Sequence, residues 1–235
     1  MNTDLMKFSS SAYSTREMVQ KSFDLATECI LKGIEGDFVE CGVAAGAQVG
    51  AMAFACQKLG VKRTFHLYDS FEGIPLAGPK DAEQPGIGKI THDKNKSLRE
   101  RLVSSGITVH GEYSVRNNIK RWCLDDQNWV FHKGWFQDTL PGNKIEKICF
   151  LRLDGDLYES TQVCLQYLGD KVSKGGIILV DDYPLAGSRR AVDEWVSDRS
   201  IQFNRMPYAL VTPAGRQKAK IDLRIPTPVY WYNNE

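Results

Sequence analysis

The sequence predicts an α/β protein with a mostly parallel sheet and helices on both faces, and two observations lead to this class. The spacing of apolar residues indicates a strand over 36–41, a helix over 47–59 and a second strand over 63–69. Two strands joined by one crossover helix are typical of a parallel sheet. The same order recurs later in the chain, with a strand over 147–154, a helix over 158–172 and an apolar strand over 176–181.

The composition is that of an ordinary globular protein and argues against several functional classes. The chain has 235 residues, of which 42% are hydrophobic and 25% are charged, so we expect one large domain with a sizeable core. The 30 lysines and arginines are balanced by 29 aspartates and glutamates, which argues against a nucleic-acid partner. The longest apolar runs fall far short of the roughly 18 residues that a membrane span needs, so no membrane partner is expected.

The N-terminal residues and the cysteines both indicate a cytoplasmic protein. Residues 1–15 are polar and serine-rich and lack the features of a secretory signal, so we expect a loose arm. Residues 16–33 follow as an amphipathic helix that ends at Gly33. None of the six cysteines forms a C-x-x-C pair, which favours reduced and buried thiols.

The rest of the chain contains one long irregular segment and several shorter elements. Residues 72–92 hold three prolines and four glycines, so we expect a long loop of the kind that often forms a lid or a binding loop. His66 lies inside an apolar strand and is expected to be a core histidine with satisfied hydrogen bonds. The remaining elements are expected as helices over 93–105 and 188–196 and as strands over 107–110, 129–132, 208–211 and 229–232, the last two forming an antiparallel pair.

A glycine-containing turn joins the first strand to the helix after it. In this turn Glu40, Gly42 and Gly46 are spaced as E-x-G-x-x-x-G, which lets the backbone approach a ligand at an electropositive helix start. Glu40 stands where the dinucleotide fingerprint has its first glycine, and its charge would repel a pyrophosphate and favour a cationic amine or sulfonium. Asp69 ends the next strand, where acids of related folds accept hydrogen bonds from ribose hydroxyls. A simple packing turn with a surface acid remains the alternative.

Four aspartates follow two strands that are consecutive in the sequence. Asp154 and Asp156 end one strand, and Asp181 and Asp182 end the next. A right-handed crossover makes these strands parallel, so their carboxyl ends lie at one edge, about 4.8 Å apart if the strands are neighbours. The carboxylates would repel one another unless a cation or a shared proton compensates them, and a hard divalent cation prefers such oxygen ligands. Solvated acids at strand ends remain the alternative.

The aromatic residues Trp135 and Phe136 follow a strand and a glycine. They either stack on an adenine or form an aromatic pair in the core. Among other functions, metal-dependent phosphoester hydrolysis could use the four aspartates, but it would not need Glu40 or Asp69. A non-catalytic nucleotide-binding module would keep the glycine turn and have no use for the aspartates.

Five motifs, in this order, closely resemble the macrocin O-methyltransferase family, whose members methylate sugar hydroxyls of macrolides and aminocoumarins. The resemblance runs from about residue 34 to 196, and more weakly to Trp231. The motifs are GDFVECGV from Gly36, YDSFEGIP from Tyr68, KGWFQDTLP from Lys133, LDGDLYEST from Leu153 and VDDY from Val180.

The resemblance implies a Rossmann-like class I methyltransferase with a mostly parallel seven-stranded sheet, which uses S-adenosylmethionine and Mg²⁺. Residues 1–33 would be an N-terminal arm and helix that contacts the acceptor as a lid or contacts a second subunit, and 34–235 would be the methyltransferase domain. The partners implied are a small-molecule glycoside substrate and further copies of the chain in a homo-oligomer. The setting implied is natural-product (antibiotic) biosynthesis.

The resemblance also assigns roles to individual residues. Asp156 matches the proposed general base. The residues implied to bind the metal are Asp154, Asp181 and Asp182. The residues implied to bind the cofactor are Glu40, Gly42, Gly46, Asp69, Ser70, Trp135, Phe136 and Asp154. Glu40 and Gly42 would line the methionine end, Asp69 would lie at the ribose, and Trp135 and Phe136 would lie near the adenine.

Overall fold

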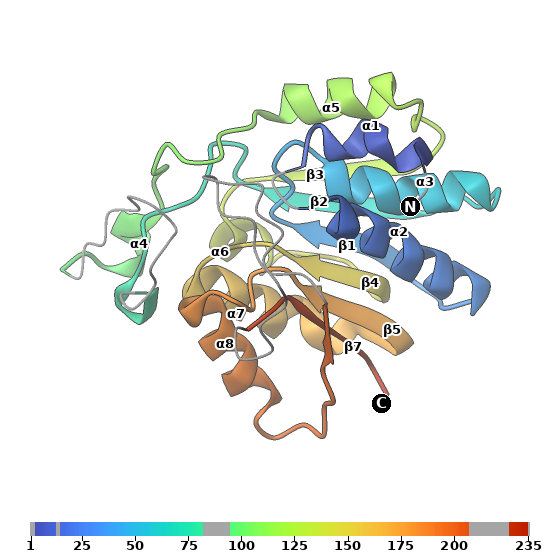
Figure 1. Ribbon diagram of the computed structural model, residues 1–235. Coiled ribbons are helices and arrows are strands. Elements are labelled where there is room, and N and C mark those ends of the chain that lie inside the picture. The colour runs from blue at the N-terminus through green and yellow to red at the C-terminus, as the bar shows by residue number, and fades with distance from the viewer. Residues whose placement is uncertain (1–2, 13–14, 82–94, 207–225, 235) are drawn as a thin grey trace.

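The computed structural model describes residues 3–12, 15–81, 95–206 and 226–234, which form an α/β fold around one seven-stranded sheet (Figure 1). The strand order is β3-β2-β1-β4-β5-β7-β6. Strands β1 to β5 are parallel, and β7 runs antiparallel to both β5 and β6. This confirms the predicted class. The strands are β1 (Asp37–Cys41), β2 (Thr64–Asp69), β3 (Asn128–Lys133), β4 (Ile148–Leu153), β5 (Val172–Val180), β6 (Asn204–Arg205) and β7 (Val229–Tyr232).

Helices cover both faces of the sheet, and a separate hydrophobic core lies beneath each layer (Figure 1). Successive strand residues point to opposite faces, so Phe38 and Phe150 join one core while Val39 and Leu151 join the other. One layer contains α1 (Met6–Ser9), α2 (Arg16–Leu31), α3 (Ala47–Lys58) and α5 (Glu112–Arg121). The other contains α6 (Phe136–Thr139), α7 (Tyr158–Leu168) and α8 (Ala186–Val196), and the short α4 (Leu98–Arg101) lies apart from the sheet. Within the described residues, no helix combines the length and apolarity needed to cross a membrane.

The strand order places a ligand site at one end of the sheet. The chain runs outward from β1 to β2 and β3, then returns through β4 on the other side of β1. In open α/β sheets, ligands bind outside the carboxyl ends of the strands at such a reversal. Strands β4 and β5, whose adjacency the sequence left open, are paired directly, which brings the ends that carry the four aspartates together.

Residues 3–12 are not part of a loose arm, as the polarity of the N-terminal residues had suggested. Phe8 is fully buried, and its ring packs edge-on against Trp122 at 4.9 Å between centroids. Gly50 on α3 makes room for this contact, since a Cβ there would lie 2.9 Å from the Trp122 ring. The expectation was wrong because Phe8 packs against Trp122, which lies 114 residues later in the chain, and a local pattern of polar residues does not reveal such a contact.

Several element boundaries also differ from the expectation. No strand forms over 107–110, because Gly106 and Thr108 adopt positive φ angles of 79° and 54°, which an extended strand does not contain. The helix expected over 93–105 shortens to α4, and β5 begins at Val172 instead of residue 176. Helix α5 was not predicted. The strand expected over 208–211 and residues 82–92 of the expected loop lie outside the described residues.

Two histidines and an aspartate form a hydrogen-bonded chain near the edge of the sheet. His66 Nδ1 lies 2.9 Å from His132 Nε2, and His66 Nε2 lies 3.2 Å from Asp37 Oδ2, so the expected satisfied histidine is confirmed. The His132 ring stacks on Tyr68 with centroids 4.0 Å apart. Burial, and then the neighbouring His66, lower the pKa of His132 to about 4.

We therefore expect His132 to make the protein less stable in acid. Between the ordinary pKa of 6.5 and the folded value of about 4, the unfolded chain binds a proton that the folded chain does not. The free energy of unfolding then falls as the pH falls through this window. The variant His132→Phe keeps a ring on Tyr68 but cannot titrate, so urea unfolding across this pH range should show a shallower slope. Equal slopes for the variant and the wild type would contradict this assignment.

Candidate active site

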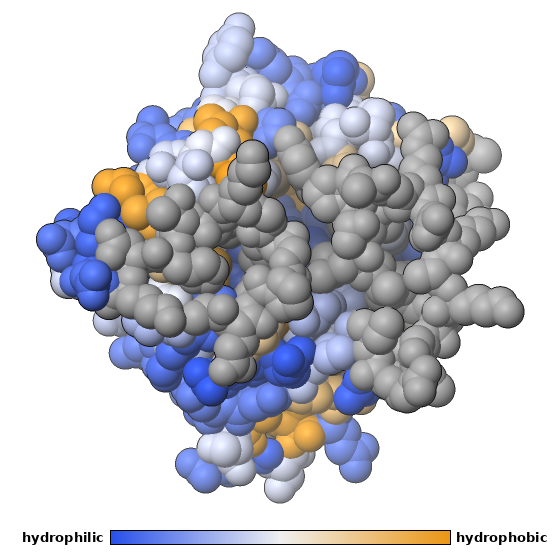
Figure 2. Space-filling model, turned by 60° about the vertical axis from the view of Figure 1, so that its left-hand side comes forward, coloured by the Kyte–Doolittle hydropathy of each residue, from blue (hydrophilic) through white to orange (hydrophobic). Residues whose placement is uncertain are grey.

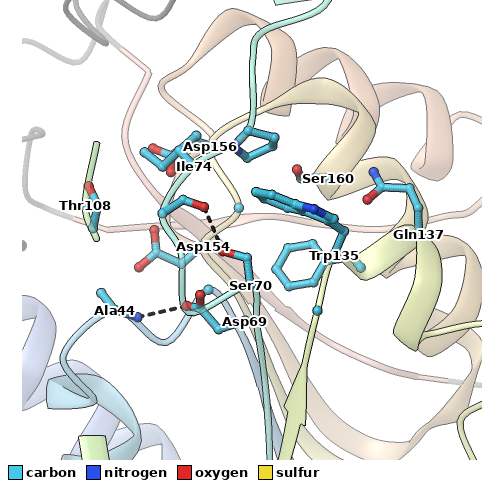
Figure 3. A pocket seen from close by; sticks show the side chains of 16 residues that line it. Ala44, Asp69, Ser70, Ile74, Thr108, Trp135, Gln137, Asp154, Asp156 and Ser160 are labelled. Carbon is cyan, nitrogen blue, oxygen red and sulfur yellow. Dashed lines mark hydrogen bonds between the residues drawn. The ribbon is translucent and has the colours of Figure 1, made fainter. Parts of the chain in front are cut away.

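A pocket lined by aromatic and acidic side chains opens at the carboxyl ends of the strands (Figure 3). We call it the aromatic pocket. It brings together most of the predicted cofactor residues from separate parts of the sequence. Its lining is Gly42, Ala44, Asp69, Ser70, Gly73, Ile74, Pro75, Thr108, Gly134, Trp135, Phe136, Gln137, Asp154, Gly155, Asp156 and Ser160.

Asp69 fixes the glycine turn against the end of β2. Its Oδ2 accepts hydrogen bonds from the backbone N–H groups of Val43 at 2.7 Å and Ala44 at 3.1 Å, and Figure 3 shows the one from Ala44. Its Oδ1 accepts one from the N–H of Phe71 at 2.7 Å. Burial raises the pKa of Asp69, and these three N–H groups lower it in part. Each carboxylate oxygen has two lone pairs, so Asp69 keeps acceptor capacity towards the pocket.

Gly42 lets the glycine turn pass directly over the end of β4. Its φ is 89°, and a Cβ built there would lie 1.8 Å from the carbonyl oxygen of Asp154. Gly46 serves a different purpose, since it precedes α3 as its N-cap with a φ of 83° and lines neither cavity described here. Of the two glycines, Gly42 is therefore the one whose missing side chain brings backbone to the site.

We expect Gly42→Ala to destabilise the protein by more than about 2 kcal/mol. The left-handed backbone alone costs an L-residue about 1–2 kcal/mol, and the overlap with Asp154 forces β1 and β4 apart. Exposed Gly142 has open space around its Cβ position and no such φ, so Gly142→Ala is a matched control that should stay within about 0.5 kcal/mol. Urea unfolding measures both, and a Gly42→Ala protein as stable as the control would contradict the close approach.

Trp135 and Phe136 are half-buried and both line the aromatic pocket. Phe136 also packs against the core beneath α7, whereas Trp135 belongs to neither of the two main hydrophobic cores among the described residues. Trp135 thus lines the pocket without joining either main core, whereas Phe136 both lines the pocket and packs against the core.

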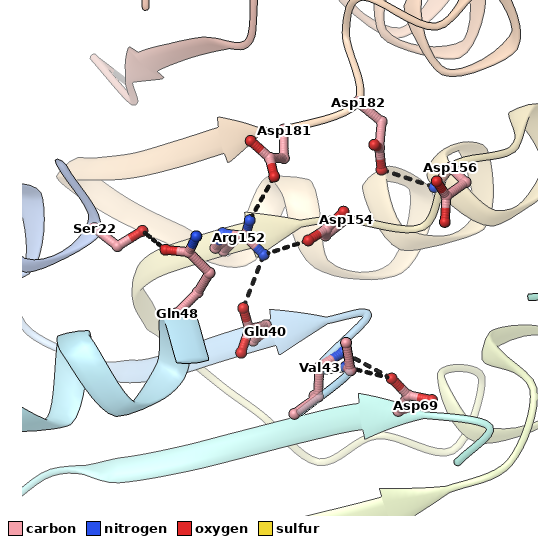
Figure 4. A network of polar contacts seen from close by, with 11 residues as sticks. Ser22, Glu40, Val43, Gln48, Asp69, Arg152, Asp154, Asp156, Asp181 and Asp182 are labelled. Carbon is pink, nitrogen blue, oxygen red and sulfur yellow. Dashed lines mark hydrogen bonds and ion pairs between the residues drawn. The ribbon is translucent and has the colours of Figure 1, made fainter. Parts of the chain in front are cut away.

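A second cavity, the acidic cavity, adjoins the aromatic pocket, because Asp154 and Asp156 line both. It is lined by residues at the ends of β1, β4 and β5, by the glycine turn and the start of α3, and by two N-terminal residues. Figure 4 shows the acidic side chains and Arg152 at this edge of the sheet. Its lining is Ser11, Ala12, Glu40, Val43, Ala44, Ala45, Ala47, Gln48, Arg152, Asp154, Asp156, Asp181 and Asp182. The four aspartates expected at this edge thus meet, and Glu40 faces the same cavity.

Arg152 is the residue that sequence reasoning missed. It is fully buried in β4, and its Nη1 donates to Glu40 Oε1 at 2.9 Å and to Asp154 Oδ2 at 2.8 Å, while its Nη2 donates to Asp181 Oδ2 at 2.7 Å (Figure 4). The protein therefore supplies part of the positive charge that we expected only from an ion or a proton. One signal was available in the sequence, because Arg152 is an arginine inside an apolar strand. It stands two residues before Asp154, which places both side chains on the same face of the strand.

The acids divide into a compensated and an uncompensated group. Burial raises the pKa of Glu40 to about 8 and that of Asp181 to about 6, although Arg152 partly lowers both. Burial and the neighbouring carboxylates raise the pKa values of Asp156 and Asp182 well above the ordinary range. In the described part of the chain no lysine or arginine forms an ion pair with these two. Asp156 also has a strained φ of 60°, and its N–H donates to Asp182 Oδ2 at 2.8 Å.

The donor set suits a hard divalent cation that keeps part of its water shell. Arg152 uses only the Oδ2 atoms of Asp154 and Asp181, and Asp182, which has no lysine or arginine partner among the described residues, follows Asp181 directly in the chain. Across the described residues, no three acidic, histidine or cysteine side chains already form a group that could hold a metal ion. Mg²⁺ commonly takes only one or two protein carboxylates, and water and substrate complete its shell.

Comparison with known proteins gives a consistent result. Residues 6–206 match the family model described as Macrocin-O-methyltransferase (TylF). An 8-demethyl-8-(2,3-dimethoxy-alpha-L-rhamnosyl)-tetracenomycin-C 4′-O-methyltransferase of Streptomyces olivaceus is 36% identical over 164 residues, which are 69% of this chain and 59% of that protein. A demethyldecarbamoylnovobiocin O-methyltransferase of Streptomyces niveus is 36% identical over 185 residues, 76% of this chain and 66% of that protein.

Solved structures agree with the sequence comparisons. The structure of the O-methyltransferase NovP superposes with a TM-score of 0.71 at 29% identity, covering 94% of this chain and 81% of that one. The chain spans only about 59–66% of the length of the two relatives described above.

Proposed function

This chain belongs to the macrocin O-methyltransferase family, and from that premise we propose that it transfers the methyl group of S-adenosylmethionine to a hydroxyl of a sugar or glycosylated small molecule, with a divalent cation. The observation that carries this proposal is the junction of the two cavities at Asp154 and Asp156. One cavity has the features of a cofactor site and the other the features of an acid-base site. A transferable methyl group and an acceptor hydroxyl would meet where they join.

The aromatic pocket suits the nucleoside part of S-adenosylmethionine. Trp135 and Phe136 would contact the adenine, and Asp69 with Ser70 would accept hydrogen bonds from the ribose. Gly42 would bring backbone to the sulfonium region, and Gly46 precedes the helix that follows the turn. Glu40 and Asp154 would face the cationic amino-acid end, for which a negative cavity is favourable. The same charge disfavours a dinucleotide pyrophosphate.

Asp154, Asp181 and Asp182 would hold Mg²⁺, not all of them as direct ligands, since Mg²⁺ commonly takes only one or two protein carboxylates and keeps several waters. The oxygens that Arg152 does not use on Asp154 and Asp181, together with the uncompensated Asp182, support this assignment. When bound, such an ion lowers the pKa of an acceptor hydroxyl and orients its oxygen.

Asp156 would act as the general base. Burial and nearby carboxylates raise its pKa, so it is a stronger base than an ordinary aspartate once ionised. It would take the proton of the acceptor hydroxyl while the hydroxyl oxygen forms its bond to the methyl carbon and the bond from that carbon to sulfur breaks. The products would be the methyl ether, S-adenosylhomocysteine and protonated Asp156. Positioning of the two substrates supplies much of the rate enhancement.

The acceptor would enter over the acidic cavity, where the N-terminal segment forms part of the wall through Ser11 and Ala12. We assign residues 1–33 to acceptor or subunit contacts and 34–235 to the methyltransferase domain. The two relatives are named for methylating tetracenomycin and novobiocin precursors, which supports a glycoside acceptor from natural-product biosynthesis. We further propose a cytoplasmic homo-oligomer without a nucleic-acid partner. Neither phosphoester hydrolysis nor a non-catalytic module accounts for both cavities sharing Asp154 and Asp156.

Two measurements test the proposed function. Titration calorimetry with S-adenosylmethionine and S-adenosylhomocysteine should show micromolar binding, while NAD should not bind. Incubation with S-adenosylmethionine, Mg²⁺ and a panel of glycosides and catechols, followed by mass spectrometry, should then show a methyl group added to a glycoside. Tight NAD binding without a signal from either adenosyl compound would refute the proposal.

A further inference from the structure

One buried arginine organises the acidic cavity. The register of β1 and β4 places Arg152 directly beside Glu40, and Asp154 follows two residues later on the same face of β4. Asp181 lies just beyond the end of β5, and Arg152 pairs with all three acids at 2.7–2.9 Å (Figure 4). The guanidinium is planar and its donors are fixed, so it holds several carboxylates in one arrangement.

This arrangement decides which carboxylate oxygens remain for a ligand. Arg152 occupies Oε1 of Glu40 and Oδ2 of Asp154. The other oxygen of Glu40, Oε2, has no partner in hydrogen-bond geometry among the described residues, although Glu40 is only 1% exposed and the backbone N–H of Val49 lies near enough to its carboxyl group to lower the pKa. Leaving a buried acceptor unpaired costs free energy, so Oε2 of Glu40 is a site prepared for a donor.

We propose that Arg152 is a positioning residue for the cationic amino-acid end of the cofactor and acts through Glu40 and Asp154. This inference rests on the proposed function. An ammonium group has three donors and needs acceptors placed around it. Arg152 turns one oxygen of each acid away from the ligand and leaves the other for the ammonium. Without Arg152, the clustered acids repel one another and lose this common orientation.

Two ligands that differ only at the amino-acid end test this role. S-adenosylhomocysteine carries the ammonium and carboxylate, whereas 5′-methylthioadenosine has the same nucleoside and a thioether but neither charged group. We expect Arg152→Met to weaken binding of S-adenosylhomocysteine by about 10- to 100-fold in calorimetry, the effect of losing hydrogen bonds to a charged group. Binding of 5′-methylthioadenosine should change by less than about twofold, because its contacts lie in the aromatic pocket.

Two further variants complete the experiment. Arg152→Lys keeps one positive charge but not the planar fork, so its affinity for S-adenosylhomocysteine should lie between those of Arg152→Met and the wild type. Arg63 is a matched control, because it donates to the backbone carbonyls of Gly36 and Ile34 near the opposite end of the sheet. Arg63→Met should leave the affinities for both ligands as they are in the wild type.

Each outcome decides the question. An equal loss of affinity for both ligands in Arg152→Met would show a purely structural role and overturn the proposal, as would unchanged binding of S-adenosylhomocysteine. If Arg152→Met does not fold, as judged by circular dichroism, the Arg152→Lys protein decides, and wild-type binding of S-adenosylhomocysteine by it would overturn the proposal. If the wild type binds neither ligand, the proposed function itself is wrong.

Discussion

The variant Asp156→Asn is expected to lower kcat for methyl transfer by about 10²- to 10⁴-fold, the usual cost of removing a general base. Affinity for S-adenosylhomocysteine should change by no more than a few-fold. Asparagine has nearly the same shape and tolerates the left-handed φ of 60° found at this position. The backbone N–H that donates to Asp182 is also retained. The variant therefore removes the proton acceptor with little disturbance of the fold.

Single-turnover methyl transfer and calorimetry on the same protein give the two quantities. The wild-type rate should rise with pH, because the base acts only when it is ionised and burial raises its pKa. The apparent pKa obtained from that rise belongs to the coupled aspartates together and not to Asp156 alone. Unchanged turnover in Asp156→Asn would mean that another residue accepts the proton, or that metal activation suffices and the proton passes to water.

Loss of the divalent cation is the second large effect that we expect. Excess EDTA should reduce turnover by at least about 10²-fold, and Asp182→Asn should do the same in the presence of Mg²⁺. Asp182 is a better test than Asp181, because Asp181 also holds Arg152, and its removal would disturb the cofactor end of the site. Calorimetry should show unchanged affinity of Asp182→Asn for S-adenosylhomocysteine.

An exposed acid provides the control for this experiment. Asp170 lies on the surface with a side chain 73% exposed, so Asp170→Asn should keep full activity with Mg²⁺. Full methyl transfer by the wild type in excess EDTA would show that the reaction needs no metal. The aspartates would then serve as structural groups and as a base, and Arg152 would supply their charge compensation.

The central part of the fold could be predicted because its signals are local. The strands at β1, β2, β4 and β5 and the helices between them show as runs of apolar residues with helical or extended spacing. The N-terminal segment could not be predicted, since burial of Phe8 depends on Trp122 far along the chain. Likewise, a bend with positive φ angles at Gly106 and Thr108 takes the place of the expected strand, and the spacing of apolar residues does not reveal it.

The candidate site also contains residues that could be predicted from the sequence and residues that could not. The glycine turn and the aspartates could be located, because strand ends of a parallel sheet meet at one edge whatever the details of packing. The role of Arg152 could not be predicted, because it depends on the register between β1 and β4 that places Arg152 beside Glu40. We expected an outside cation to balance the acids, and the structure shows that the chain carries part of that balance itself.

The pairing of Arg152 with Glu40 has a consequence for how the chain folds. These residues are 112 positions apart, and Asp181 comes from a third strand, so no short fragment of the chain contains the acidic cavity. Closing so long a loop is entropically costly, and the cavity therefore forms only when β1, β4 and β5 have all paired. A ligand that binds there recognises the completed fold alone. At a concentration 100 times its dissociation constant, it adds about 2.7 kcal/mol to the stability of the whole domain.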